Sequence, residues 1–181
     1  MEKPNRPYWE QVYSMLETVD VATGERTVHK RFDSLIEAPN WLPDGNTLLY
    51  NAGGSLWLFD LTTKESRKVD TGSAARCNND HVLSPDGGQV GLSSAGPEGR
   101  SLVYVVPLSG GEPRLVTPVG PSYLHGWSPD GTTLAYCAER NGEFDIYTIP
   151  VEVGEETGKL PEMLDKIANT YDEEVDNAVS A

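Results

Sequence analysis

Short runs of apolar residues alternate with polar turns along most of this chain, and the alternation itself repeats. The triplet Pro-Asp-Gly occurs at residues 43–45, 85–87 and 129–131, so its copies lie 42 and 44 residues apart. A period of about 40 residues that is built from short strands is typical of β-propeller blades. Proline presets φ at the second turn position and glycine accepts a positive φ at the fourth, so each triplet predicts a tight turn between two strands.

The first complete repeat predicts a four-stranded antiparallel meander, which is the unit of one blade. Its expected strands are residues 40–42, 47–51, 55–61 and 66–69. Further strands are expected in the second repeat at 89–94, 101–108 and 113–116, and in the third at 133–137 and 144–149. Near the N-terminus, residues 12–20 and 26–30 predict the third and fourth strands of an earlier blade.

Large apolar residues recur at one register in the third strand of each repeat. The matching sets are Trp57, Tyr104 and Tyr147, followed by Phe59, Val106 and Ile149. Stacked repeats need such recurrence to build a continuous core.

The C-terminal stretch follows a different pattern. From Leu160 to Val179 the apolar residues recur at steps of three and four, which predicts an amphipathic helix. We therefore expect an all-β partial β-propeller of about three four-stranded antiparallel blades plus part of another, with a C-terminal amphipathic α-helix. The expected division is outer strands of an incomplete blade over residues 1–31, propeller blades over 32–151 and a helical tail over 152–181.

The repeats resemble the TolB family of β-propellers over roughly residues 8–151. The resemblance rests on APNWLPDG at 38–45, HGWSPDG at 125–131, SLWLFDL at 55–61 and FDIY at 144–147. The segments CNNDH at 77–81 and PSYLHGW at 121–127 resemble a stand-alone bacterial TolB-like subgroup. The resemblance implies the fold, whereas the same repeat builds scaffolds, sugar-lyase propellers and gating domains of prolyl-oligopeptidase-type peptidases.

The tail resembles the F-domain of type II secretion and type IV pilus inner-membrane assembly proteins. The matching segments are VGEETGKL at 153–160, EML at 162–164 and YDEEV at 171–175, and we expect the join between Ile149 and Pro161. Propellers of this kind usually close with about six blades or more. We therefore interpret the chain as a fragment, a chimeric gene model or an engineered fusion. The alternative is an arc that closes by dimerisation or with another chain.

The composition is acidic, with a net charge of −14. Residues 1–151 contain 19 acidic and 12 basic side chains, which gives −7, and residues 152–181 contain 9 and 2, which gives another −7. Since neither part carries a basic patch, nucleic acid and anionic membrane surfaces are poor partners. We expect no membrane span, because no run of 18 apolar residues occurs. The polar first residues lack a signal peptide, so a cytoplasmic location is expected, with a periplasmic one implied as possible by the TolB resemblance.

The remaining reactive side chains have ordinary interpretations. Cys77 and Cys137 lie in different repeats, and we expect two buried thiols. His29 lies on a polar outer strand, where we expect it to be solvated.

The most concentrated polar chemistry lies on the innermost strand of each blade. The candidate ligand-binding residues are Asn40, Trp41, Asn78, Asn79, Asp80, His81, Tyr123, His125 and Trp127. Because innermost strands line the central channel of a propeller, Asp80, His81 and His125 could meet there as donors, acceptors or metal ligands. In a structural interpretation, Asp and Asn instead bond to neighbouring amides, and a histidine bonds between blades.

Several observations point away from catalysis. The aspartate of Pro-Asp-Gly occurs in three copies, whereas a catalytic residue need occur only once, so we assign it to the turns. The chain has no Gly-x-Ser-x-Gly elbow of the kind that carries a serine nucleophile. We therefore expect no catalytic residue, no metal and no cofactor.

Three functions fit these observations. The main hypothesis is a non-enzymatic scaffold that binds a protein or peptide across the channel mouth or an exposed face, with self-association through open blade edges as a further possibility. The second is a sugar-binding or lyase-type propeller remnant with its site in the channel. The third is a fragment of a secretion or pilus assembly protein, whose helix packs in a helical bundle.

Overall fold

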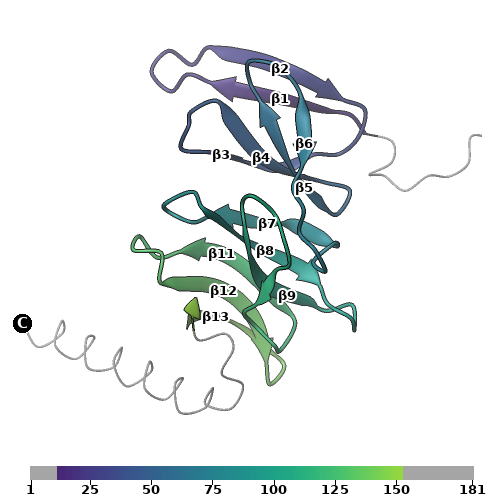
Figure 1. The fold of residues 1–181 in the computed structure, drawn as a ribbon, viewed down its shortest axis with the longest axis vertical. Coiled ribbons are helices and arrows are strands. Elements are labelled where there is room, and N and C mark those ends of the chain that lie inside the picture. Colours follow the sequence, from purple (N-terminus) through teal and green to yellow (C-terminus); the bar gives the residue numbers. More distant parts are fainter. Residues whose placement is uncertain (1–11, 153–181) are drawn as a thin grey trace, which may run out of the picture.

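Four antiparallel β-sheets follow one another along the chain and stack face against face (Figure 1). The structure is a computed structural model that describes residues 12–152. The first sheet contains β1 (Ser14–Val19) and β2 (Arg26–Phe32). The second contains β3 (Glu37–Trp41), β4 (Thr47–Ala52), β5 (Ser55–Asp60) and β6 (Ser66–Lys68).

The third sheet repeats this four-stranded meander, and the fourth repeats its first three strands among the described residues. The third contains β7 (Cys77–Leu83), β8 (Gln89–Ala95), β9 (Ser101–Pro107) and β10 (Arg114–Leu115). The fourth contains β11 (Ser122–Trp127), β12 (Thr133–Arg140) and β13 (Glu143–Pro150). The first strands of successive sheets contact one another, β3 with β7 and β7 with β11. The strands expected from the sequence are all present, with ends that differ by at most three residues.

The Pro-Asp-Gly turns have the expected backbone. Gly45, Gly87 and Gly131 have φ values of 66°, 71° and 73°, which is the left-handed region that glycine adopts without strain. The aspartate of each turn accepts hydrogen bonds from its own turn: the Ser128 hydroxyl donates to Asp130 at 2.6 Å and the Thr132 amide donates at 3.0 Å. These bonds lower the pKa of Asp130 to about 2. The aspartates of the Pro-Asp-Gly triplets therefore stabilise their own turns.

Neighbouring sheets bury the faces that they turn toward each other. We call the face toward the preceding sheet the back face and the opposite one the front face. The predicted register holds, because Phe59, Val106 and Ile149 are each buried on the back face of their sheet. A cluster of buried hydrophobic side chains fills the contact between the front face of each sheet and the back face of the next.

The contact between successive sheets is matched in size, residue by residue. Leu49 on the front of the second sheet packs in a cluster with Leu83 on the back of the third. Trp127 occupies the place of Leu83 one repeat later, and the position of Leu49 is then Gly91. A Cβ on Gly91 would lie 2.7 Å from Cδ2 of Leu124 and 3.2 Å from Nε1 of Trp127. The indole therefore fits because Gly91 has no side chain.

Polar contacts cross the same interfaces. The Trp127 Nε1–H donates to the Val82 carbonyl at 3.0 Å, and the Leu124 amide donates to the Ser93 hydroxyl at 2.8 Å. The turns also stack, since a Cβ on Gly87 would lie 2.7 Å from Cγ of Pro43. The Pro-Asp-Gly turns therefore pack against one another between blades, in addition to joining two strands within each blade.

Two expectations about single residues need correction. Cys77 is buried as expected, but Cys137 is only half-buried because no described strand covers the front face of the fourth sheet. His29 is not simply solvated. Its Nδ1 lies 3.0 Å from the Lys64 ammonium and its Nε2 lies 2.8 Å from the Thr18 hydroxyl, so it links the first sheet to the second. The helix expected near residues 160–179 lies outside the described residues.

Gly91→Ala should destabilise the fold by about 1–3 kcal/mol, because the added methyl overlaps Leu124 and the Trp127 ring. Gly126→Ala is the matched control, since a Cβ there meets nothing within 4 Å. Urea unfolding of both variants measures the difference. Equal losses of stability in the two would contradict the size-matched contact.

Candidate functional site

Each first strand carries a β-bulge in its pairing with the second strand. The register shifts between Glu37 and Asn40 in β3, between Cys77 and His81 in β7 and between Leu124 and Gly126 in β11. A bulge leaves extra residues outside the ladder and redirects their side chains, and bulges are frequent next to functional sites. The repeated bulges therefore define the candidate site.

Each of the three bulges contains one exposed residue. These residues are Pro39, Asn79 and His125. In β3 the bulge also holds Ala38 at a φ of 50°, a conformation that is uncommon for a residue other than glycine. Strained backbone of this kind is found preferentially at binding and catalytic sites.

In β7 the bulge is braced by two candidate residues. The Asn78 Nδ2 group donates to Oδ2 of Asp80 at 2.7 Å, and the Asp80 amide donates back to Oδ1 of Asn78 at 3.0 Å. Both side chains are half-buried. They hold the loop that presents Asn79.

Three of the candidate residues lie in the contacts between neighbouring sheets rather than in the central channel expected from the sequence. The Asn40 Nδ2 group donates to the Ala38 carbonyl at 2.8 Å and to the His81 carbonyl at 3.2 Å, which joins β3 to β7. Trp127 bonds to Val82 as described above. The His81 side chain is only 2% exposed. Asn40 and Trp127 therefore form hydrogen bonds between sheets, as the structural interpretation expects, whereas His81 is buried there without a hydrogen bond from its ring.

His81 is buried without a hydrogen bond to either ring nitrogen among the described residues. Burial lowers the pKa of His81 below its ordinary value of 6.5, because the charged form loses its hydration. The carbonyls of Leu49 and Ala38 and the nearby Asp80 carboxylate act in the opposite direction without overcoming burial. His81 is thus held neutral inside the contact between the second and third sheets.

The other two candidates have different surroundings. Tyr123 is half-buried, whereas Trp41 is 52% exposed on the back face of the second sheet. Of the three residues expected to meet in the channel, only His125 is exposed. Within residues 12–152, no group of three or more His, Cys, Asp or Glu side chains is arranged to hold a metal ion.

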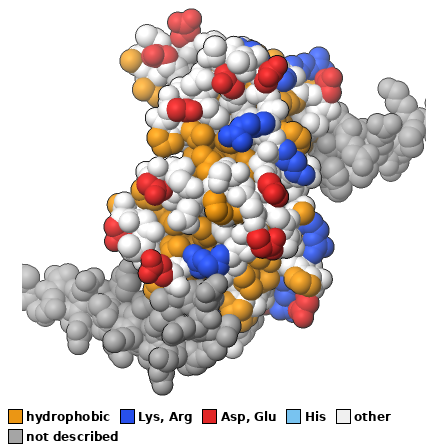
Figure 2. Space-filling model, in the orientation of Figure 1, with side chains coloured by type: hydrophobic (Ala, Val, Ile, Leu, Met, Phe, Trp, Pro, Cys, Tyr) orange, Lys and Arg blue, Asp and Glu red, His pale blue; other side chains and the backbone are white. Residues whose placement is uncertain are grey.

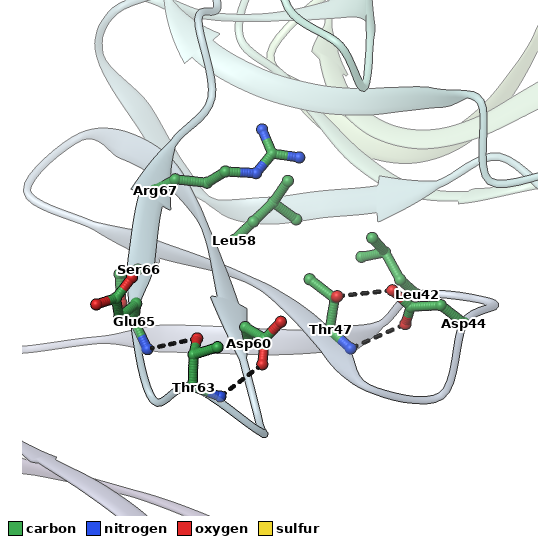
Figure 3. A pocket seen from close by; sticks show the side chains of 9 residues that line it. All are labelled: Leu42, Asp44, Thr47, Leu58, Asp60, Thr63, Glu65, Ser66 and Arg67. Carbon is green, nitrogen blue, oxygen red and sulfur yellow. Dashed lines mark hydrogen bonds between the residues drawn. The ribbon is translucent and has the colours of Figure 1, made fainter.

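A separate cavity of about 320 Å³ opens at the Pro-Asp-Gly end of the second sheet (Figure 3). Its walls include the carboxylates of Asp44 and Asp60, the Arg67 side chain and Leu58. Asp44 accepts the Thr47 hydroxyl and amide at 2.6 and 2.8 Å, and Asp60 accepts the Thr63 amide at 2.8 Å. Because turn contacts occupy both aspartates, this cavity is a weaker candidate than the bulges.

Sequence reasoning missed Ala38 and Pro39 as site residues. They stand at the same distance before their Pro-Asp-Gly triplet as Leu124 and His125 do before theirs. That alignment could have identified Pro39 as the counterpart of His125. A bulge itself leaves no mark in the apolar pattern, because it depends on the pairing between strands.

The face shown in Figure 2 has acidic and basic side chains interspersed, and hydrophobic side chains gather where the second and third sheets meet. No helix among the residues that the structure describes is long and apolar enough to cross a membrane. Four-stranded antiparallel meanders that stack face to face, with their first strands on one side, define a β-propeller protein. The family model for the TolB beta propeller domain matches residues 8–162, and the chain belongs to that family.

Two relatives show how far the similarity extends. An uncharacterized protein of Agrobacterium fabrum is 46% identical over 145 residues, which cover 80% of this chain and 50% of the relative. The Tol-Pal system protein TolB of Francisella tularensis is 25% identical over 154 residues, which cover 82% of this chain and 35% of the relative. The chain therefore spans half or less of the length of these relatives.

Solved structures agree with this fold. A structure from Agrobacterium tumefaciens assigned as TolB has a TM-score of 0.73 and 43% identity, over 78% of this chain and 52% of that one. An oligogalacturonate lyase in complex with manganese has a TM-score of 0.62 but 20% identity, over 81% of this chain and 42% of that one, and shows the fold alone. Nothing found supports the F-domain resemblance of the tail.

Lowering the pH from 7 to 5 should destabilise the protein through His81. Because its folded pKa is lowered, its contribution to stability is complete above pH 6.5 and is lost as the pH falls through the folded pKa. The slope between these values is at most about 1.4 kcal/mol per pH unit. Thermal melts of His81→Leu should lose this slope, and melts of the exposed control His125→Leu should keep it. A slope that survives in His81→Leu would contradict the assignment.

Proposed function

We propose that this chain is a non-enzymatic interaction scaffold that binds a protein or an extended peptide across the bulged ends of β3, β7 and β11. The observation that carries the proposal is the placement of Pro39, Asn79 and His125, exposed on adjoining bulges of three successive sheets. The neighbouring residues are held by contacts between sheets, so the surface is preorganised for a ligand.

The chemistry of the bulges suits peptide recognition. The Asn79 amide and the His125 imidazole can each donate and accept a hydrogen bond, as peptide groups do. Pro39, on the second sheet, adds a rigid apolar contact beside them. The net charge of −14 favours partners that carry basic residues, because opposite charge speeds association and excludes acidic competitors.

A lyase-type or sugar-binding site would require polar side chains that converge in the central channel. His81 would be one of them, and it is buried between sheets instead. Asp80 is engaged with Asn78. A non-enzymatic scaffold therefore explains the positions of His81 and Asp80 better than a lyase-type site does.

Replacing Asn79 and His125 together by alanine should weaken peptide binding at least about tenfold, the change expected when about 1.4 kcal/mol of contacts is lost. Peptides would be selected from a random displayed library against the immobilised full chain, and their affinities would be measured by fluorescence titration. Gln89→Ala, which removes an exposed polar side chain of β8, is the control and should leave affinity unchanged.

Two results would count against the proposal. One is a library that yields no peptide with a dissociation constant below about 100 µM, which corresponds to about 5.5 kcal/mol. The other is a set of peptides whose affinity falls equally in Gln89→Ala and in the double variant.

Manganese and acidic oligosaccharides should leave the melting temperature within about 1 °C of its value without them. Any ligand specific for the native state at 100 times its dissociation constant adds about 2.7 kcal/mol, which would shift the melt by several degrees. Differential scanning fluorimetry of the full chain with each additive measures this. A saturable rise of about 5 °C with both additives would favour a lyase-type site instead.

A further inference from the structure

The cavity at the Pro-Asp-Gly end of the second sheet is formed by that sheet and its own turns. Three of its lining residues, Leu58, Asp60 and Arg67, lie on one face. Arg67 pairs with Leu58 across the strands, and Asp60 follows Leu58 by two residues along β5. This is the front face, because Leu58 belongs to the hydrophobic cluster that the second and third sheets share. The cavity therefore lies at the edge of that cluster.

Opposite charges stand at the two ends of the cavity, with an apolar wall between them. Figure 3 shows the Arg67 guanidinium at one end and the Asp60 carboxylate at the other, with Leu58 between them. Asp44 joins the acidic end, because its carboxylate binds Thr47, which pairs with Asp60. Among residues 12–152, Arg67 forms no ion pair with a carboxylate. Both kinds of charge therefore face the cavity rather than each other.

Turn contacts engage both aspartates without exhausting their capacity to accept hydrogen bonds. The Thr47 hydroxyl is the largest of the contacts that lower the pKa of Asp44, and the Thr63 amide is the largest for the pKa of Asp60. The Thr62 and Thr63 amides both donate to Oδ1 of Asp60, at 2.7 and 2.8 Å, so its Oδ2 can accept a further donor. The acidic end is therefore ionised at neutral pH and open to a cation.

We propose that this cavity binds a ligand that carries an ammonium group and a carboxylate at the two ends of an aliphatic stem, which is the chemistry of lysine. The ammonium group binds at Asp60 and Asp44, the stem lies along Leu58, and the carboxylate takes two parallel hydrogen bonds from Arg67. Two residues along a strand rise by about 7 Å, which a stem of about five methylene groups spans. The site contains none of the bulge residues, so it goes beyond the proposed function and is tested independently.

The probe is 6-aminohexanoate, which has both charges and the stem but lacks the α-amino group of lysine. Amide NMR titration of the full chain should show saturable shifts at Thr47, Leu58 and Asp60, with a dissociation constant of about 1 mM or lower for a ligand of this size. β-Alanine has the same charges on a shorter stem and should bind at least about tenfold more weakly. No saturable shift at about 10 mM, or shifts confined to the other sheets, would overturn the proposal.

Arg67→Gln tests the basic end. It should weaken 6-aminohexanoate at least about tenfold and leave the weaker binding of pentylamine unchanged, because pentylamine has no carboxylate. Lys68→Gln is the matched control, since it removes the same charge from the next residue of β6, which pairs with Trp57 on the opposite face. Equal losses of affinity in the two variants would contradict a carboxylate bound at Arg67.

Asp60→Asn tests the acidic end and keeps an acceptor for the turn amides. It should weaken both 6-aminohexanoate and pentylamine at least about tenfold. Asp20→Asn is the matched control, because Asp20 accepts the amides of Ala22 and Thr23 in the corresponding turn of the first sheet. Unchanged affinity in Asp60→Asn would overturn the proposal. Arg67 is exposed, so the Arg67 and Lys68 variants stay informative if Asp60→Asn lowers stability.

Two sources offer this chemistry, namely free lysine and a partner chain that ends in lysine. A short peptide with a C-terminal lysine, the same peptide with an amidated C-terminus and free lysine separate them in the same titration. Tighter binding of the peptide identifies a partner terminus, and tighter binding of free lysine identifies the amino acid. Either result supports the proposal. An amidated peptide that binds as tightly as the free-carboxylate peptide and as 6-aminohexanoate would overturn it.

Discussion

The structure depends on one constraint, which is that the front face of each sheet must fit the back face of the next. An isolated four-stranded sheet of this size leaves both apolar faces in water, and only stacking removes them. The fit is local and reciprocal, since leucine meets leucine at Leu49 and Leu83 whereas tryptophan meets glycine at Trp127 and Gly91. A large side chain on one sheet is thus accommodated by a small residue on the other, as close packing requires.

This constraint also decides which polar residues remain available for binding. Asn40, His81 and Trp127 look functional in the sequence because they are polar or aromatic and cluster on first strands. Stacking places all three in the contacts between sheets, where Asn40 and Trp127 bond to carbonyl groups of the neighbouring sheet. The bulges then expose Pro39, Asn79 and His125, which are the residues that the stacking leaves free.

Membership of the TolB beta propeller domain family explains the architecture but leaves the ligand open, because one fold supports many functions. The bulges and the exposed apolar side chains offer two different kinds of surface. The bulges are polar and small, which suits an extended peptide. Trp41 and Ile146, on the second and fourth sheets, are exposed apolar side chains instead.

The sequence by itself determined the repeat, the strand positions, the turn chemistry and the register of Phe59, Val106 and Ile149, because all of these follow from local propensity and a period of two along each strand. Only the tertiary structure decided that His81 is buried, that Asn78 binds Asp80, that Cys137 is half-exposed and that the bulges present Pro39, Asn79 and His125. These features depend on which sheet packs on which and on extra residues outside the ladder. Neither changes the alternation of apolar and polar residues that the sequence displays.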